Sequence, residues 1–529
     1  MKLVFSVAVV GILSWILSVY GNLWHESQRL RKRLQMQGIK GPPPSFLHGN
    51  LPDMQRIQSQ AKAASTCNSD LSDQFLAHDY TATLFPYFEH WRKQYGLLYT
   101  YSTGMKQHLY VNQPDLVREM NQCITLDLGK PTYITNKLAP MLGNGILRAN
   151  GLSWAQQRKL VAAEFFMDKV KKSIVVHYLH IYAVPAPHKK LSPASSNSKG
   201  SATAEVKVDV DLRGFSADVI SRVCFGHSYS KGKEVFSKLR SIQKAMSKHG
   251  GFLFGLSSFR DKLKHLSSKK QNEIASLEKE IESLIWELVE ERKRECSGTS
   301  SSEKDLMQLL LEAAMTDQSL GKDFSKRFIV DNCKNIYFAG HETTAVAASW
   351  CLMLLALHPE WQTRIRTEVA ELCPNGVPDA DSVPLLKTVA MVIKEVLRLY
   401  PPAAFVSREA YEDIQIGNLN VPKGVCLWTL IPTLHRDPEI WGPDANEFKP
   451  ERFSEGVSKA CRFPHAYVPF GLGTRLCLGK NFAMVQLKVV LALIISKFSF
   501  SLSPSYRHSP AYRMIVEPGH GVHILIQEI

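Results

Sequence analysis

Ten residues near the C-terminus combine the features that a reactive thiolate needs. Cys477 lies in the segment 470–479, which reads FGLGTRLCLG, and we expect a helical run from Leu478 to Ile495 to follow it. The N-terminus of a helix favours an anionic sulfur, and a thiolate is both a nucleophile and a metal ligand. The glycines allow the backbone to approach a bound group closely. The alternative for these residues alone is a buried free cysteine in a glycine-rich turn.

A second unusual stretch lies inside a long apolar segment. Residues 325–357 are expected to form one helix, with Ser325 as its N-cap and His358-Pro359 as its stop. Most of its circumference is apolar, so it should cross the centre of the protein. Residues 339–344 within it read AGHETT, and a glycine, an acid and two threonines are poor helix material. We therefore expect the helix to interrupt its hydrogen bonding there for a functional reason.

Two further pairs have helical spacing. Glu395 and Arg398 are three residues apart, and Trp154 and Arg158 are four apart, so each pair shares one helix face. An acid and an arginine at this spacing are common in proteins and usually form a solvated pair of little energetic value. Neither pair specifies a function without the cysteine segment.

Taken together, these motifs resemble the cytochrome P450 superfamily, whose haem-thiolate loop has the pattern F-x-x-G-x-R-x-C-x-G. The resemblance implies a mainly α fold with small β-sheets, in which the long helix passes over a haem b and the cysteine loop lies beneath it. Cys477 would bind the iron, and a thiolate ligand favours O–O cleavage. The residues expected to contact the cofactor are Trp154, Arg158, Arg408, Phe470, Gly473, Arg475 and Gly479. For Arg408, a surface position on a strand is the alternative.

The resemblance also assigns roles around the haem. Glu342 and Thr343 match an acid–alcohol pair in which the hydroxyl hydrogen-bonds O2 and the acid supplies protons through water. An ion-paired structural acid is the alternative for Glu342, and His341 is expected to be structural. A buried ion-pair network that braces the cysteine loop is expected from Glu395, Arg398 and Arg452.

Finer sequence features indicate the substrate class. Residues 83–91, 145–154 and 338–344 look like those of plant members of the clan that includes gibberellin oxidases. The resemblance implies a monooxygenase that inserts one oxygen atom of O2 into a terpenoid, either a gibberellin-type diterpenoid or a related triterpenoid. A pentacyclic triterpenoid C-oxidase and an inactive, haem-free product are the alternatives, and the intact Glu342-Thr343 pair argues against haem chemistry without O2. Candidate pocket residues, which would equally suit a plain core, are Phe338, Ala339, Ala403, Phe405 and Val406.

The chain has no electron-carrier motif of its own. There is no G-x-G-x-x-G fingerprint, no Walker loop and no H-E-x-x-H motif. In the resembled family, electrons come from NADPH through NADPH–cytochrome P450 reductase, whose docking face is acidic. We expect a monomer whose matching basic face includes Arg158, Lys159, Lys480 and Lys488.

The N-terminus predicts a membrane anchor. Residues 3–24 carry no charge, and a helix of this length spans roughly 33 Å, about the thickness of a bilayer core. The basic residues that follow would stay on the cytosolic side. The expected organisation is an anchor over 1–24, a basic and proline-rich linker over 25–44 and a catalytic domain over 45–529, held as a single-pass protein at the endoplasmic reticulum. A cleaved signal peptide is the alternative.

Composition excludes several classes of protein. The 529 residues are 45% hydrophobic and 21% charged, which is unlike a disordered or fibrous chain. Ten cysteines without a C-x-x-C pair argue against a disulfide scaffold, a zinc ribbon or a thioredoxin motif, and favour a reducing compartment. The net charge of +15 is spread along the chain, so a membrane surface, an acidic partner or plain solvation explains it better than nucleic acid.

One stretch departs from the resembled subfamily. Helices are expected over 154–170, 212–225 and 273–294, and strands over 97–111. Residues 171–204 instead lose helical period, contain three prolines and become serine-rich. This stretch is either a tolerated surface variant or an error in the gene model that replaced an exon.

Overall fold

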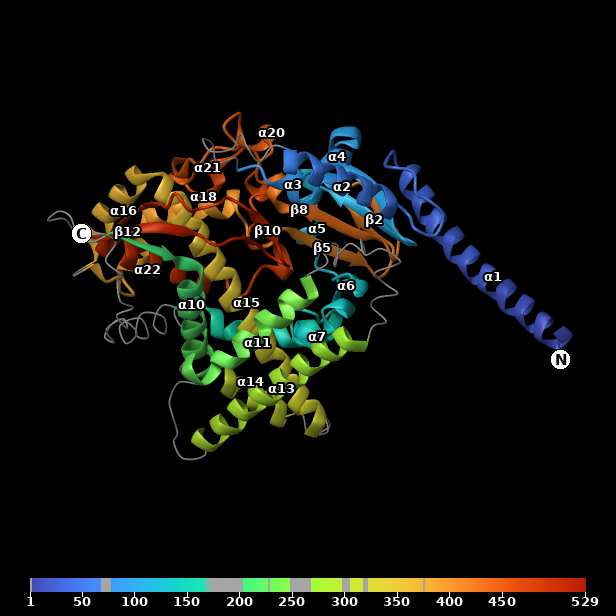
Figure 1. Cartoon of the computed structure of the whole chain (residues 1–529), viewed down its shortest axis with the longest axis horizontal. Coiled ribbons are helices and arrows are strands. Elements are labelled where there is room, and N and C mark those ends of the chain that lie inside the picture. Colours follow the sequence, from blue (N-terminus) through green and yellow to red (C-terminus); the bar gives the residue numbers. More distant parts are fainter. Residues whose placement is uncertain are drawn as a thin grey trace.

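The computed structural model describes residues 2–67, 78–167, 170, 203–226, 229–247, 268–296, 305–316, 322–373 and 376–529. Helices make up most of this chain, and they surround four small sheets (Figure 1). The expected mainly α architecture with small sheets is therefore observed. The unusual stretch 171–204 lies outside the described residues except for its last two.

The largest sheet has five strands in the order β1-β2-β8-β5-β3. The strands are β1 (Leu98–Thr103), β2 (Lys106–Val111), β8 (Cys426–Leu430), β5 (Phe405–Ala410) and β3 (Leu128–Gly129). β1 and β2 form the hairpin that the alternation over 97–111 predicts, and β2 runs parallel to β8. The sheet brings β5, which carries Arg408, beside β3, which precedes Lys130.

A three-stranded sheet joins β4 (Ala204–Lys207), β12 (His523–Glu528) and β9 (Phe498–Leu502). Two hairpins complete the β-structure, one of β6 (Ile414–Ile416) with β7 (Leu419–Val421) and one of β10 (Pro510–Tyr512) with β11 (Val516–Pro518). β4 leads directly into helix α10 (Val208–Phe225), so the C-terminal strands lie beside the start of that helix.

The central element is helix α15 (Lys322–Leu357). It begins three residues before the predicted N-cap, because the Ser325 hydroxyl donates to Ala314 O instead of capping the helix (3.1 Å). It ends at the predicted place, before His358 and Pro359. α15 runs through residues 339–344 without a break, so the expected interruption of helical hydrogen bonding is not observed.

Gly340 has a packing role in this helix. A Cβ at Gly340 would lie 2.6 Å from Ile220 Cδ1 on α10, so the glycine allows the two helices to pack closely. The other helices around α15 are α11 (Tyr229–Ser247), α13 (Ser268–Cys296), α14 (Leu306–Thr316), α16 (Pro359–Leu372), α18 (Lys387–Leu399) and α22 (Lys480–Lys497). α10 and α13 confirm the helices expected over 212–225 and 273–294. The helix expected over 154–170 is shorter, because α8 spans Gly151–Ala162 and gives way to a 3-10 turn at Ala163–Phe165.

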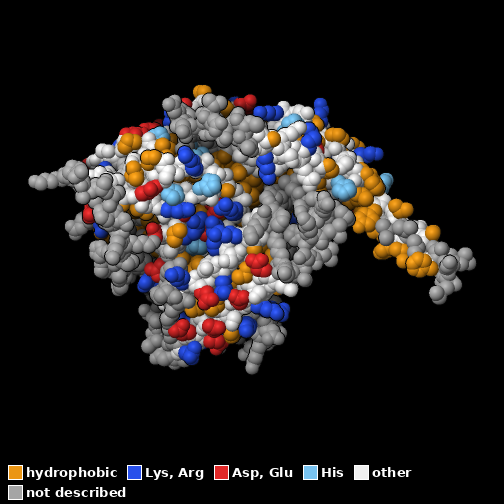
Figure 2. Space-filling model, viewed as in Figure 1, with side chains coloured by type: hydrophobic (Ala, Val, Ile, Leu, Met, Phe, Trp, Pro, Cys, Tyr) orange, Lys and Arg blue, Asp and Glu red, His pale blue; other side chains and the backbone are white. Residues whose placement is uncertain are grey.

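The N-terminal residues form α1 (Lys2–Gln35), which projects from the body of the protein (Figure 1). Across the described residues, no helix combines the length and the apolar character that a membrane crossing requires. The segment expected to span the membrane is helical. Exposed apolar side chains nevertheless follow its projecting part (Figure 2), including Phe5, Trp15 and Leu17.

The predicted basic and proline-rich linker over 25–44 is packed against the domain. α1 continues to Gln35, Leu34 and Ile39 are buried, and Arg31 donates to Pro42 O (2.8 Å). A Cβ at Gly41 would lie 1.8 Å from Thr100 O, so the chain there is pressed against β1. These contacts attach the proline segment to the large sheet.

Candidate functional site

Cys477 lies in a loop that holds its sulfur close to a helix N-terminus. Cys477 N donates to Phe470 O (2.9 Å), which closes the loop, and α22 begins at Lys480 rather than at the predicted Leu478 because the chain first turns through Gly479. Burial raises the pKa of the Cys477 thiol, and the Gly479 and Lys480 amides and the Arg158 charge act against that rise. The surroundings therefore offer donors to an anionic sulfur.

Gly473 fits this loop for a steric reason. Its φ is +65°, and a Cβ there would lie 1.5 Å from Asn121 O, on a different segment. Because that neighbour is backbone, no side-chain movement could relieve the clash. The glycine of the motif thus lets the loop pack against the end of helix α5 (Pro114–Gln122).

A cavity of about 530 Å³ lies over Cys477. Six of the seven residues predicted to contact the cofactor line it, namely Trp154, Arg158, Arg408, Phe470, Arg475 and Gly479. The seventh, Gly473, does not line the cavity and instead packs against Asn121 O. All five predicted pocket residues line it as well: Phe338, Ala339, Ala403, Phe405 and Val406. Apolar side chains dominate the remaining wall, which is formed by residues such as Ile134, Leu142, Ile146, Phe165, Ile336 and Phe482.

Four cations gather at one side of this cavity. They are Lys130, Arg158, Arg408 and Arg475. In the described part of the chain, none of them has a carboxylate within 4.0 Å. Burial lowers the pKa of Arg408 and of Arg475 to about 10 each, and burial together with the three arginines lowers the pKa of Lys130 to about 7. A cluster of four cations without acidic partners is costly to bury unless an anion binds beside it.

Trp154 organises two of these cations. The Arg475 guanidinium lies 4.1 Å from its ring centroid, and that of Arg158, one helical turn along α8, lies at 5.6 Å. Arg475 also donates to Asn150 Oδ1 (3.0 Å), and Asn150 Oδ1 accepts from the backbone of Lys130 (2.8 Å). Asn150 therefore links the cysteine loop to the loop that carries Lys130.

The residues present fit a haem. A single thiol, an apolar wall and a group of cations without acid partners suit an iron, a porphyrin and its two propionates respectively. Among the described cysteines, Cys477 is the one that lines the cavity; it is accessible, while Cys333, Cys351 and Cys426 are buried elsewhere.

The structure separates Glu342 from Thr343. Consecutive helix residues point about 100° apart, so Thr343 lines the cavity over Cys477, whereas Glu342 lines a second pocket. The Thr343 hydroxyl donates to Ala339 O (2.6 Å), which leaves its lone pairs to accept a hydrogen bond from the cavity. His341 is buried against the Phe236 ring (4.9 Å), and burial lowers its pKa to about 4, in agreement with a structural role.

Glu342 is held by two arginines that the sequence did not identify. Its Oε1 accepts from Arg213 Nε (3.0 Å) and from Arg240 (2.5 Å), while its Oε2, which is buried, has no hydrogen-bond partner. Burial would raise the pKa of Glu342, but Arg213, His341 and Arg240 outweigh it, so the pKa lies below the ordinary value. The carboxylate is thus charged and retains one oxygen without a donor.

The predicted ion-pair network is present. Arg398 binds Glu395 through two bonds of 2.7 Å, and both side chains are fully buried. Arg452 Nε lies 3.4 Å from the same carboxylate. The helix that carries this pair is tied to the cysteine segment, because Tyr467 donates to Lys394 O (2.9 Å).

Two of the four cations predicted to contact the reductase, Arg158 and Lys488, do not lie on the exposed surface. Arg158 faces the cavity, and Lys488 donates to Val383 O (2.7 Å) and is partly buried. Lys159 and Lys480 are exposed. All four side chains lie on α8 or α22, so belonging to one of these helices does not predict which cations are exposed.

A thiol at the floor of an apolar cavity, flanked by unpaired cations and crossed by a central helix, defines a haem-thiolate class of protein. Comparison with known proteins agrees, because residues 74–521 match the family model described as Cytochrome P450. The chain belongs to the cytochrome P450 family. Members are monooxygenases that use a haem with a cysteine thiolate, O2 and NADPH-derived electrons, so the predicted family, enzyme class and cofactors are confirmed.

Several relatives are similar over nearly their whole length. The chain is 54% identical over 528 residues to "Cytochrome P450 714A2" of Arabidopsis thaliana, covering 99% of this chain and 98% of that protein. It is 47% identical over 511 residues to "Cytochrome P450 714C2" of Oryza sativa subsp. japonica, covering 97% and 95% respectively. It is also 43% identical over 532 residues to "Cytochrome P450 714B3" of Zea mays, covering 100% and 96%.

Proposed function

We propose that this monooxygenase oxidises a terpenoid, and that a gibberellin-type diterpenoid is the preferred skeleton. The observation that carries the proposal is the cavity wall, in which apolar side chains surround the space between Cys477 and α15. Apolar pockets with few polar groups suit ligands of this kind.

Cys477 would hold the haem iron, and Arg158, Arg408, Arg475 and Lys130 would neutralise the propionates. The bound haem supplies the activation of O2. Thr343 lines the cavity, and its hydroxyl oxygen would accept a hydrogen bond from a water there. Glu342 Oε2 lies 3.6 Å from His341 Nε2 and has no hydrogen-bond partner, so it can hold a water on the other side of the same helical turn. Together the two side chains move protons from the second pocket toward the cavity.

The network of Glu395, Arg398 and Arg452 positions the cysteine loop. The support for this role is the chain of contacts from α18 to the residues before Phe470, which includes the bond from Tyr467 to Lys394 O. The pair itself does not touch the cavity, so its effect on the cofactor would be indirect.

Electrons would reach the haem from NADPH–cytochrome P450 reductase docked on the cysteine side of the protein. Lys480 at the start of α22 and Lys159 on α8 are exposed and suit an acidic partner. Reversing both charges should raise the reductase concentration needed for half-maximal turnover, with a weaker salt dependence. Unchanged reductase titration would remove these two residues from the docking face.

The protein would work at a membrane of the endoplasmic reticulum through α1. The exposed apolar side chains of its projecting part support attachment, because such side chains are otherwise costly to leave in water. Removal of residues 1–24 should shift the protein from the membrane pellet to the supernatant after high-speed centrifugation. Equal pelleting of both forms would exclude α1 as the attachment.

The first experiment is a reduced carbon-monoxide difference spectrum of the full chain. A Soret band at the thiolate-ligated wavelength is expected, and Cys477→Ser should shift or abolish it, whereas Cys373→Ser, a buried cysteine away from the cavity, should not. Substrate spectra with gibberellins and with a pentacyclic triterpenoid would then test the skeleton. A normal haem spectrum with no response to any diterpenoid would refute the substrate proposal while leaving the family assignment intact.

A further inference from the structure

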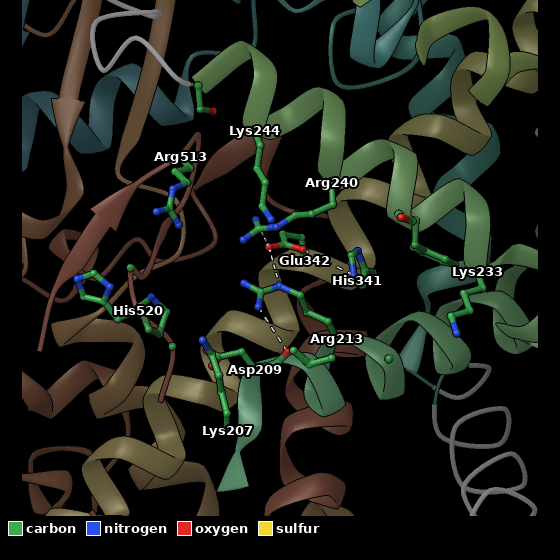
Figure 3. A pocket seen from close by; sticks show the side chains of 18 residues that line it. Lys207, Asp209, Arg213, Lys233, Arg240, Lys244, His341, Glu342, Arg513 and His520 are labelled. Carbon is green, nitrogen blue, oxygen red and sulfur yellow. Dashed lines mark hydrogen bonds and ion pairs between the residues drawn. The ribbon is translucent and has the colours of Figure 1, made fainter. Parts of the chain in front are cut away.

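A second pocket lies on the other side of α15 from the haem cavity. Its volume is about 700 Å³, and Glu342 lines it one residue away from Thr343, which lines the haem cavity (Figure 3). Its walls come from the start of α10, from α11 and from the hairpin end around residues 513–521. On the molecular surface, Lys and Arg side chains gather between β10 and α11 (Figure 2).

Positive charge dominates the pocket. Six cationic side chains line it, namely Lys207, Arg213, Lys233, Arg240, Lys244 and Arg513. Against them stand the carboxylates of Asp209 and Glu342 in the wall and of Glu517 behind it. The described side chains around the pocket therefore carry a surplus of three positive charges.

The arginines form a fixed framework. Glu517 is fully buried and binds Arg213 (3.1 Å), Arg240 (2.7 Å) and Arg513 (2.5 Å). Glu342 shares Arg213 and Arg240 with it. Because each arginine is held by a buried acid, the guanidinium groups keep one orientation, with Arg513 facing Arg240 across the pocket (Figure 3).

The lysines supply the surplus. Lys207, Lys233 and Lys244 are exposed, and across the described ranges none has a carboxylate within 4.0 Å. They come from different places, Lys207 from β4 and the other two from positions eleven residues apart on α11. Ser247 Oγ also lines the pocket and is buried without a hydrogen-bond partner. The three ammonium groups and the Ser247 hydroxyl can therefore donate hydrogen bonds to a bound ligand.

We propose that this pocket binds a small polyanion that carries several phosphate groups. Lysine ammonium groups and oriented arginine forks suit phosphate oxygens, and three surplus charges match a multiply charged ligand better than a single carboxylate. The volume leaves room for more than one phosphate. Because Arg213 and Arg240 also hold Glu342, a bound polyanion would compete with Glu342 for the same guanidinium groups. The inference concerns binding and does not depend on the substrate of the haem site.

Isothermal titration of the haem-loaded full chain with sodium tripolyphosphate tests the proposal. We expect saturable one-to-one binding that weakens with salt. The double variant Lys207→Gln and Lys244→Gln should bind about tenfold more weakly, which corresponds to about 1.4 kcal/mol. A matched control is Lys387→Gln with Lys459→Gln, two exposed lysines outside the pocket, and it should bind like the unchanged protein.

Two results would overturn the proposal. One is the absence of saturable binding at low salt, and the other is equal weakening in the pocket and control variants, since that would indicate attraction to the overall positive charge. All four lysines are exposed, so unchanged haem spectra are expected to confirm that the variants fold.

A second experiment, with lipid vesicles, identifies the source of the phosphates. Vesicles containing phosphatidylinositol phosphate that bind through the pocket lysines and are displaced by tripolyphosphate indicate a lipid headgroup. Vesicles that bind both variants equally indicate a free phosphorylated molecule.

Discussion

Lys130 should destabilise the protein when haem is absent. Its ammonium group shares the cavity edge with Arg158, Arg408 and Arg475, and burial together with these charges lowers its pKa from 10.5 to about 7. Each pKa unit corresponds to about 1.36 kcal/mol, so the full conversion is roughly 5 kcal/mol. Because Lys130 borders a cavity that admits water, we take about half of that, or about 2–3 kcal/mol. Lys130→Met should stabilise haem-free protein by this amount at pH 7.

The pH dependence follows from the direction of the shift. Below pH 7 both the folded and the unfolded protein hold the Lys130 proton, so the full penalty applies. Between about pH 7 and 10.5 the unfolded chain holds more protons than the folded one, so the unfolding free energy of the unchanged protein rises with pH. The advantage of Lys130→Met should therefore shrink between pH 7 and pH 9.

Urea unfolding of haem-free protein at pH 7 and pH 9 measures this advantage. Other titrating groups contribute equally to both proteins and cancel in the difference. Lys459→Met, at an exposed site, should change stability little at either pH. The haem-loaded proteins should behave in the opposite sense, with faster haem loss to excess apomyoglobin in Lys130→Met. An equal stability difference at both pH values, or lower stability of haem-free Lys130→Met, would show that the buried Lys130 charge does not destabilise the protein.

Three further changes test separate parts of the site. Gly473→Ala should abolish the thiolate Soret band per mole of protein, because its Cβ meets Asn121 O at 1.5 Å; Gly424→Ala, also at positive φ but in open space, should keep the band, and equal loss in both would contradict the steric argument. Arg398→Ala leaves Glu395 buried without its main partner and should cost about 3–5 kcal/mol in urea unfolding, whereas a loss below about 1 kcal/mol would mean that Arg452 compensates. Glu342→Gln should lower product formed per NADPH consumed by about tenfold or more while leaving substrate affinity unchanged, and unaltered coupling would exclude a role in proton delivery.

Most residues predicted for the haem site line the cavity over Cys477, because the expected chemistry restricts their types. A thiolate, its glycines and the arginine of one short loop are neighbours in sequence, so their spacing is visible before folding. Lys130 was missed for the opposite reason. It lies between a two-residue strand and a proline, with no local pattern, and only the pairing of β3 with β5 brings it beside Arg408.

Other predictions failed where tertiary packing decides the outcome. The sequence 339–344 suggested a broken helix, but α10 packs against Gly340, and the threonine hydroxyls find acceptors in the preceding turn without breaking the helix. The prolines and charges of residues 25–44 predicted a stiff linker, but the sequence did not show what that linker contacts. The burial of Leu34 and Ile39 against the sheet could be recognised only once that sheet was assembled.

The geometry of α15 shows which pocket each member of the acid–alcohol pair lines, and the sequence alone does not reveal this. Adjacent residues on a helix point about 100° apart, and here Glu342 lines the cationic pocket while Thr343 lines the haem cavity. Glu342 is the wall between the haem cavity and a cationic pocket, and Arg213 and Arg240 hold it charged there. Any proton that reaches Thr343 through this acid must therefore come from the cationic side, where the arginines control how strongly the carboxylate holds it. If the second pocket binds a polyanion as proposed, its occupancy should change the product formed per NADPH consumed, because Glu342 and Thr343 are adjacent in α15.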